Sequence, residues 1–259
     1  MSTTTDKTID LRTVEPIDLR TGTELGRTEY QRFVEALRGL DDAGWSSPTD
    51  CTEWTVRDLA GHVGAMMWSV SKVRRFAREQ MQSARRAKAE GLDDPTDAMT
   101  AIQVERFAGR TESELVDTMN ELIEPAIAGR LRIPGSVARS VRFAVPVGGE
   151  PERWSLAYLY GTILTRDTWL HRVADLARAV DDRPEIDADH DGRIVADAAA
   201  EWARRHGKPV ELTLSGSAGG RFRQGSGGPS IELDAIEFCR MTSGRSEPTH
   251  LLLGTAVAW

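Results

Sequence analysis

The sequence predicts a mainly helical protein in two parts, a set of long helices followed by a smaller α+β domain. Its 259 residues exceed one small bundle and suit two domains of ordinary size. Apolar residues recur at three- and four-residue spacing through most of 23–180, and they alternate in the manner of strands only after residue 191. Between these patterns, residues 181–191 are acidic and poor in apolar side chains, which is typical of a linker.

The first part is expected to contain four helices. Two begin at residues that resemble capping boxes, Thr55 with Asp58 and Thr111 with Glu114, because each side chain can accept a free amide of the first turn. Between the third helix and the fourth, Gly and Pro punctuate residues 129–151 and favour an irregular segment. The four helices are expected at 23–40, 55–91, 111–128 and 155–180.

The two ends of the chain differ in character. Residues 1–22 are polar, with too few apolar side chains to form a core, so we expect a flexible N-terminal arm. Residues 192–259 combine helical and alternating patterns, which predicts the small α+β domain. Its expected elements are helix 194–205, strands 210–214, 221–223 and 230–233, and helix 235–241.

Composition argues against several classes of partner. The 33 basic and 40 acidic residues give a net charge of −7, which disfavours nucleic acids and anionic membranes. No apolar run approaches the roughly 18 residues of a membrane span, and the N-terminus is polar, so a cytoplasmic location is expected. The two cysteines, Cys51 and Cys239, lie far apart. A metal site must therefore rely on histidine and carboxylate ligands.

Three side chains are candidates for such a site. Asp167 and His171 are four residues apart on the fourth helix, so both leave one face and can bind one ion. Such a pair also arises easily by chance, as in Asp58 and His62, where Asp58 is better explained as a cap. His62 lies beside the apolar stripe of its helix. Pattern alone leaves it either a hydrogen-bonded core histidine or a metal ligand.

A longer motif favours the ligand interpretation. Residues 45–63, WSSPTDCTEWTVRDLAGHV, resemble the N-terminal signature of the mycothiol-dependent maleylpyruvate isomerase family, which is related to the DinB-like four-helix bundles. The resemblance implies a DinB-like bundle followed by a small C-terminal α+β domain. It also implies that His62, Asp167 and His171 hold a divalent metal, with zinc expected. One departure is that the family often has Glu where this chain has Asp167.

The same resemblance implies a chemistry. Zinc with three protein ligands keeps an open position, and there it deprotonates a bound thiol, which in the family is mycothiol. The expected activity is attack of the thiol on a small acidic electrophile, as an S-transferase or a cis–trans isomerase. Arg245, in Ser243-Gly244-Arg245, resembles a Gly-Arg element of the family that supplies a functional arginine.

Other residues and functions stay open at this point. Arg74 and Arg78, with Arg75, are expected on the same helix as His62, where they either form a solvated face or anchor a substrate carboxylate or cofactor. Cys51 is interpreted as a packed small side chain rather than a nucleophile. Two alternative functions are a non-catalytic binding or regulatory protein that kept the bundle, and a zinc hydrolase that binds hydroxide in place of the thiol.

Overall fold

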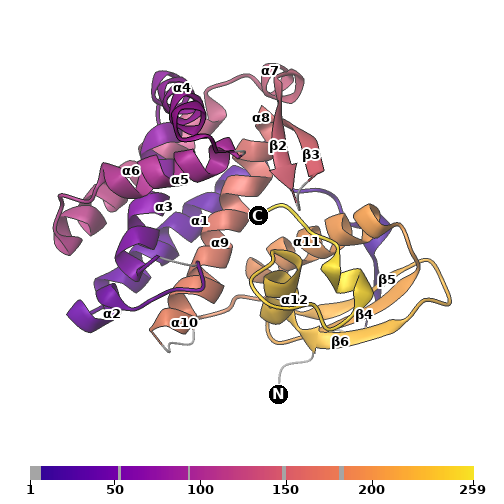
Figure 1. Ribbon diagram of the computed structural model, residues 1–259. Coiled ribbons are helices and arrows are strands. Elements are labelled where there is room, and N and C mark those ends of the chain that lie inside the picture. Colours follow the sequence, from indigo (N-terminus) through magenta and orange to yellow (C-terminus); the bar gives the residue numbers. More distant parts are fainter. Residues whose placement is uncertain (1–6, 52–53, 93, 148–149, 181–183) are drawn as a thin grey trace. The chain divides into compact units, whose positions relative to one another are not determined.

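The computed structural model describes residues 7–51, 54–92, 94–147, 150–180 and 184–259. The chain divides into two compact units (Figure 1): residues 18–183 form one, and residues 1–17 join residues 184–259 in the other. The first unit is mostly helical, and the second contains a four-stranded sheet with helices. The predicted fold class, a helical bundle with a small α+β domain, is therefore confirmed.

Long helices of the first unit share one apolar core. α1 contacts α6 and α9, and α3 contacts α6. Tyr30 and Phe33 of α1, Leu59 of α3 and Met119 of α6 are fully buried there. Both predicted capping boxes form, at the starts of α3 and α6. The long helices are α1 (Leu19–Arg38), α3 (Val56–Val70), α6 (Glu112–Leu131) and a helical run of five segments between Leu156 and Ala179.

The predicted second helix is divided in two, and this corrects the expectation of one helix over 55–91. α3 ends at Val70, and Lys72 has extended backbone angles before the next helix begins. The hydroxyl of Ser71 donates to the carbonyl of Trp68 at 2.7 Å, which satisfies a carbonyl at the end of α3. The next helices are α4 (Val73–Glu90) and α5 (Pro95–Arg106), and α5 was not predicted.

The segment expected to be irregular, 129–151, contains regular structure. A strand within it pairs antiparallel with a strand that starts at its end and continues past residue 151, with Phe143 opposite Trp154. A further short helix lies within the turn-rich segment 41–50, where Asp41 accepts the amide of Gly44 at 2.9 Å. These elements are α2 (Asp42–Ser46), α7 (Gly135–Ser140), β2 (Arg142–Val147) and β3 (Glu150–Ser155).

The predicted fourth helix forms, but two of its segments are π-helical. π-Helical turns change the backbone hydrogen-bond pattern and often occur at functional sites. The buried guanidinium of Arg130, from α6, donates to the carbonyl of Tyr160 at 2.6 Å and to that of Gly161 at 3.3 Å. Arg130 thus satisfies carbonyls of the first π-helical segment. The successive segments are α8 (Leu156–Tyr158), η2 (Leu159–Ile163), α9 (Leu164–Leu170), η3 (His171–Leu176) and α10 (Ala177–Ala179).

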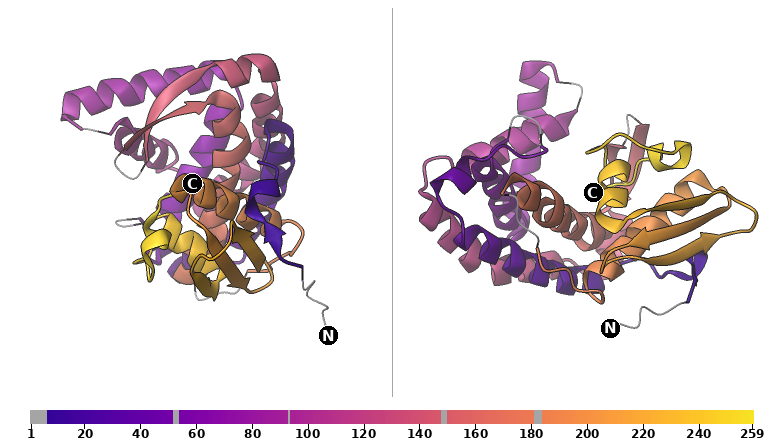
Figure 2. Two further views of the ribbon diagram at one scale, coloured as in Figure 1. Left: turned by 90° about the vertical axis from the view of Figure 1, so that its right-hand side faces the viewer. Right: turned by 90° about the horizontal axis from the view of Figure 1, so that it is seen from below.

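The second unit confirms the strands predicted near the C-terminus. Its sheet has the order β1-β5-β4-β6, where β1 is Ile9–Asp10, with β4 antiparallel to β5 and parallel to β6. Along β4, Val210, Leu212 and Leu214 are buried while Glu211 is exposed, so one face of the sheet is covered. α11 and α12 both contact the strands and supply that cover (Figure 2). The elements are α11 (Asp191–His206), β4 (Val210–Ser215), β5 (Gly220–Gln224), β6 (Ser230–Asp234), α12 (Ala235–Thr242) and η4 (Leu251–Gly254).

The N-terminal residues differ from the expected flexible arm over 1–22. Residues 1–6 of that arm lie outside the described part of the chain. After them, β1 (Ile9–Asp10) pairs with β5 in parallel, and η1 (Leu11–Thr13) follows. Leu11 is buried, and the amide of buried Ile17 donates to Asp197 of α11 at 2.8 Å. Two buried apolar side chains and one edge strand thus attach residues 9–17 of this polar segment to the rest of the unit.

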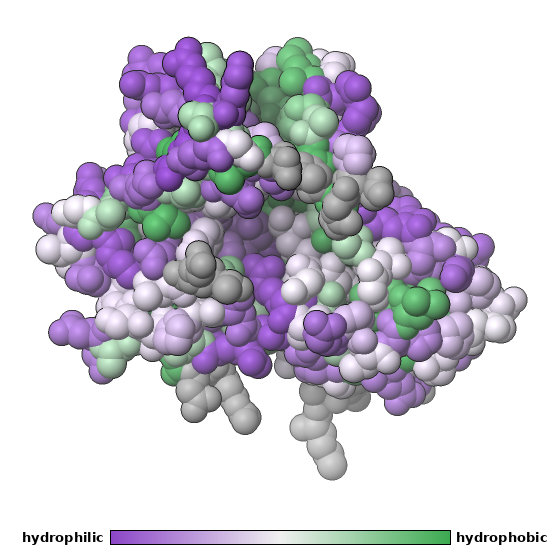
Figure 3. All heavy atoms as spheres, viewed as in Figure 1, coloured by the Kyte–Doolittle hydropathy of each residue, from purple (hydrophilic) through white to green (hydrophobic). Residues whose placement is uncertain are grey.

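The linker expected at 181–191 can be compared only in part, since residues 181–183 lie outside the described residues. Asp191 already belongs to α11. None of the described helices combines the length and the apolar character needed to cross a membrane. On the face drawn in Figure 3, hydrophilic side chains predominate and hydrophobic ones form small separate groups.

Candidate metal centre

α3 presents His62 toward the interior of the helical unit. The helix begins at Thr55, whose amide donates to the Asp58 carboxylate at 2.9 Å, so Asp58 acts as the predicted cap residue. Seven residues into α3, His62 is only 5% exposed, with Leu59 and Met66 buried on either side of it in the sequence. The ring of Trp54 lies against it, with 5.0 Å between ring centroids. The signature residues Thr52 and Glu53 lie outside the described part of the chain.

The fourth helical run presents the other two predicted ligands. Asp167 lies in α9, and His171 is the first residue of the π-helical segment η3. Their side chains leave one face of the helix, as the four-residue spacing requires. His171 is 3% exposed, while the side chain of Asp167 keeps 19% of its surface exposed. Asp167 is therefore the one partly exposed member of the three.

The three side chains meet. Nε2 of His62 lies 3.8 Å from Oδ2 of Asp167, and Nε2 of His171 lies 3.5 Å from Oδ1 of the same carboxylate. All three offer one ligand atom within 4.8 Å of the others. The two imidazole rings stand nearly perpendicular, with centroids 5.3 Å apart. Asp167 therefore lies between two histidine nitrogens that face it from different helices.

The electrostatics of the cluster favour a charged carboxylate. Burial raises the pKa of Asp167, but the charges of His171 and His62 outweigh it and hold that pKa well below its ordinary value. Burial lowers the pKa of His171, whereas the carboxylates of Asp167 and Asp175 raise it, and the net direction is upward. The site thus attracts positive charge, from a proton or a metal cation.

Asp175, which was not among the predicted site residues, contacts His171. Nδ1 of His171 lies 2.6 Å from Oδ2 of Asp175, and Asp175 is fully buried. Cys51 was considered only as a nucleophile or a packed side chain, yet its thiol donates to the same Oδ2 at 3.4 Å. The signal for Asp175 was present in the sequence as a second four-residue spacing, from His171 to Asp175.

The expected position of Arg74 and Arg78 requires a correction. They lie on α4 and not on the helix that carries His62, because α3 ends at Val70. Both side chains are exposed. The neighbouring Arg75 instead stacks on Trp68, with 4.6 Å from its guanidinium carbon to the ring centroid. A binding role for Arg74 and Arg78 stays a prediction.

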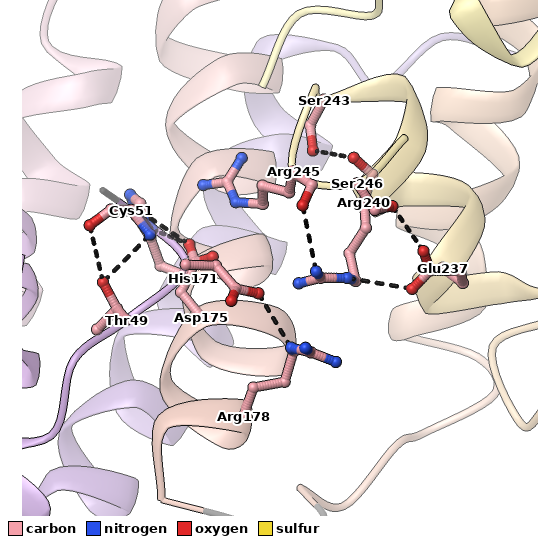
Figure 4. Close-up of polar contacts among 11 residues, drawn as sticks. Thr49, Cys51, His171, Asp175, Arg178, Glu237, Arg240, Ser243, Arg245 and Ser246 are labelled. Carbon is pink, nitrogen blue, oxygen red and sulfur yellow. Dashed lines mark hydrogen bonds and ion pairs between the residues drawn. The ribbon is translucent and has the colours of Figure 1, made fainter. Parts of the chain in front are cut away.

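Arg245 belongs to the other unit, in the loop after α12. Its carbonyl accepts a hydrogen bond from the guanidinium of Arg240 at 3.2 Å, and Arg240 also donates to Glu237 at 3.1 Å (Figure 4). Ser246 donates to Glu237 as well, at 2.6 Å. These hydrogen bonds restrain the backbone of the loop at Arg245 and Ser246. The functional role expected for Arg245 stays a prediction.

Comparisons with known proteins agree with this architecture. Two solved structures match over 92% of this chain and 93% of theirs, with a TM-score of 0.53 and 14% identity. One is a mycothiol-dependent maleylpyruvate isomerase, and the other is a variant of it with one histidine replaced by alanine. At this identity the likeness shows the fold. No curated protein matches the chain.

A family model provides the stronger assignment. The model of the mycothiol maleylpyruvate isomerase N-terminal domain matches residues 27–177, which is more than half of the chain. The matched region includes His62, Asp167, His171 and Asp175. The sequence resemblance carried by residues 45–63 is thereby confirmed. The chain belongs to the family of proteins that share the mycothiol maleylpyruvate isomerase N-terminal domain.

Proposed function

We propose that this protein is a metal-dependent enzyme that uses mycothiol, and that His62, Asp167 and His171 hold its metal ion. Two imidazoles and one carboxylate suit a divalent cation, with zinc the best match to the donor set. Three protein ligands leave a position for a further ligand, which is typical of catalytic rather than structural zinc. The two solved relatives are described as a mycothiol-dependent isomerase, which supports the thiol assignment.

The spacing of the three ligand atoms carries the proposal. Separations of 3.5 and 3.8 Å from Asp167 are too long for good N–H···O hydrogen bonds. They are close to the ~3.3 Å expected between neighbouring ligands about 2.0–2.1 Å from a tetrahedral zinc. Oδ2 of Asp167 is also buried and has no hydrogen-bond partner among the described residues. Buried carboxylate oxygens seldom lack such a partner. A shared cation explains both observations.

The residues around the site suit activation of a thiol. Bound zinc lowers the pKa of a coordinated thiol, so mycothiol is available as a thiolate at neutral pH. Burial of His62 and His171 keeps water from competing for their ring nitrogens. In the proposed function, a thiol approaches the ion from the side of Asp167, the one partly exposed ligand.

The second substrate in this proposal is a small electrophile that carries an acidic group. Arg245 is the proposed catalytic arginine. Arg245, Arg74 and Arg78 are each proposed to bind an anionic group of mycothiol or of the electrophile. The product is either a cis–trans isomer, as with maleylpyruvate, or a stable S-conjugate. Both outcomes require the same activated thiol.

Elemental analysis of purified protein tests the metal site. We expect near-stoichiometric zinc in the wild-type protein and a loss of most of it in His62→Ala and Asp167→Asn. His250→Asn is the matched control, since an asparagine can keep the cap that His250 makes with the Leu252 amide. Absence of any divalent metal from the wild-type protein, even after incubation with zinc, would contradict the proposal.

A second assay tests the chemistry. The zinc-loaded protein is incubated with mycothiol and maleylpyruvate, and with other carboxylate-bearing electrophiles, and the products are identified by mass spectrometry and ultraviolet absorption. We expect an isomer or a conjugate that forms only when zinc and mycothiol are both present. Stoichiometric zinc without turnover of any electrophile would favour a binding protein, and turnover that does not need the thiol would favour a hydrolase.

A further inference from the structure

We infer that Asp175 is a positioning residue of the metal centre, which holds the imidazole of His171 in the tautomer and orientation that expose Nε2 to the ion. This inference rests on the metal site proposed above and extends it to a residue outside the ligand set. It also assigns Cys51 a role, as the thiol that fixes the Asp175 carboxylate.

The two ring nitrogens of His171 face two different carboxylates. Nε2 lies 3.5 Å from Oδ1 of Asp167, at metal-ligand spacing, whereas Nδ1 lies 2.6 Å from Oδ2 of Asp175, at hydrogen-bond distance. A proton on Nδ1, donated to Asp175, leaves the lone pair of Nε2 free for a cation. The short bond therefore selects the tautomer that can coordinate.

Asp175 is itself firmly held. Its side chain is fully buried, one helical turn beyond His171 in η3. The Cys51 thiol donates to Oδ2 at 3.4 Å, so this oxygen accepts bonds from two directions. Cys51 is fixed in turn, because its amide donates to the hydroxyl of Thr49 at 3.2 Å. Figure 4 draws Thr49, Cys51, His171 and Asp175 close together. Residues Thr49 and Cys51 of the signature segment 45–63 thus hold the carboxylate that orients His171.

The other histidine lacks an equivalent support. Nδ1 of His62 is buried and has no hydrogen-bond partner among the described residues. Its ring is oriented by packing against Trp54 instead. Of the two imidazole ligands, only that of His171 has its tautomer selected by a carboxylate in the described structure. Loss of Asp175 therefore removes the strongest orienting contact of the centre.

The test measures zinc affinity in Asp175→Asn, which keeps the size of the side chain and removes its charge. Competition with a chromophoric chelator should show zinc binding 10–100-fold weaker than in the wild-type protein, the usual effect of removing a carboxylate that orients a ligating histidine. Cobalt(II) substituted into the variant should also show a shifted visible spectrum, because the ligand geometry changes.

Glu79→Gln is the matched control. Glu79 is another buried carboxylate of the same unit, bonded to Gln103 at 2.9 Å and to Arg106 at 3.1 Å. This variant should lose stability while keeping the zinc affinity and the cobalt spectrum of the wild-type protein. A structural role alone for Asp175 would leave these two readouts unchanged in Asp175→Asn as well.

A measurement on the wild-type protein does not depend on the folding of any variant. Long-range nitrogen–proton NMR of the zinc form should show His171 with its proton on Nδ1. Coordination through Nδ1, or unchanged zinc affinity in folded Asp175→Asn, would overturn the role of Asp175 while leaving the metal site intact. Failure of the wild-type protein to bind zinc would overturn the proposed function and this inference together.

Discussion

Arg172 donates two hydrogen bonds to the carboxylate of Glu29, at 2.8 and 3.1 Å, inside the helical unit. The side chains are 3% and 0% exposed, so the ion pair is buried. Arg172 directly follows the candidate ligand His171, and Glu29 lies on α1. The ion pair therefore holds η3, which carries His171, against α1.

Substitution of Glu29 by Gln should be strongly destabilising. It leaves the buried guanidinium of Arg172 without its carboxylate, and such a change costs about 3–5 kcal/mol. Urea unfolding followed by circular dichroism measures the loss. The control is Glu35→Gln, whose partner Arg38 is exposed, and there the free energy of unfolding should change by ~1 kcal/mol or less. Equal losses in the two variants would show that burial of the pair is unimportant.

The close approach of α1 to the helical run 156–179 predicts a second position at which substitution lowers stability. A Cβ atom at Gly22 would overlap the carbonyl of Gly161 in η2, whose backbone cannot move away cheaply. Gly22→Ala should therefore lower the free energy of unfolding by about 1–3 kcal/mol, as expected for overpacking. Gly39, at the end of α1, has helical backbone angles and open space around it.

Gly39→Ala is thus the matched control for Gly22→Ala. It should leave stability unchanged or raise it by roughly 0.4–1 kcal/mol, because alanine restricts the unfolded chain. Thermal unfolding of both variants, followed by circular dichroism, makes the comparison. A wild-type melting temperature in Gly22→Ala would contradict the helix contact itself.

Arg130 gives a prediction about the π-helical segment. Its guanidinium donates to Tyr160, Gly161 and Gly22 carbonyls and, at 2.7 Å, to the hydroxyl of Thr165. Arg130→Met keeps the length of the side chain but removes these four buried hydrogen bonds, each of which contributes about 0.5–1.5 kcal/mol. The Gly22 carbonyl keeps the hydrogen bond from the Thr165 hydroxyl, at 2.6 Å.

The expected result is a loss of several kcal/mol for Arg130→Met, together with faster amide exchange around η2. Arg132→Met, an exposed position just after α6, serves as the control and should behave like the wild-type protein. Slow exchange at Thr162 and Ile163 in folded Arg130→Met would mean that the π-helical turn does not depend on this arginine.

The positions of several helices and strands could be predicted from local patterns. The capping boxes at Thr55 and Thr111 and the alternation at 210–214 describe interactions within a few residues, and these formed as predicted. The break after Val70 did not follow, because the apolar stripe continues to Val73 and only the hydroxyl of Ser71, turned back onto the Trp68 carbonyl, marks the end of α3.

In the candidate site, too, local features could be predicted from the sequence and features that depend on tertiary packing could not. The spacing of Asp167 and His171 was readable, and the family signature added His62, whose approach to them depends on packing between distant helices. Asp175 also had the right spacing, but nothing local says which of two carboxylates, one before and one after His171, faces which ring nitrogen. That distinction exists only once the ring is placed in three dimensions.

The second unit supplies a prediction about pH. His206, at the end of α11, packs its ring edgewise on buried Trp202, with 4.4 Å between centroids, and its Nδ1 accepts the amide of Lys208 at 3.0 Å. Burial, and to a smaller extent the charge of Lys208, lower the pKa of His206. Protonation of Nδ1 would also remove the hydrogen bond that this nitrogen accepts from the Lys208 amide.

Because the pKa of His206 is lower in the folded than in the unfolded chain, the unfolded chain binds the proton first as pH falls. The contribution of His206 to stability is complete above pH ~6.5, the ordinary histidine value, and is lost as pH falls through the lowered pKa. Urea unfolding at pH 7.5 and 5.5 should therefore show a smaller pH-dependent loss in His206→Asn than in the wild-type protein. NMR titration of the wild-type ring should give a midpoint below the ordinary value, and a midpoint at or above it would mean that the ring is not buried against Trp202.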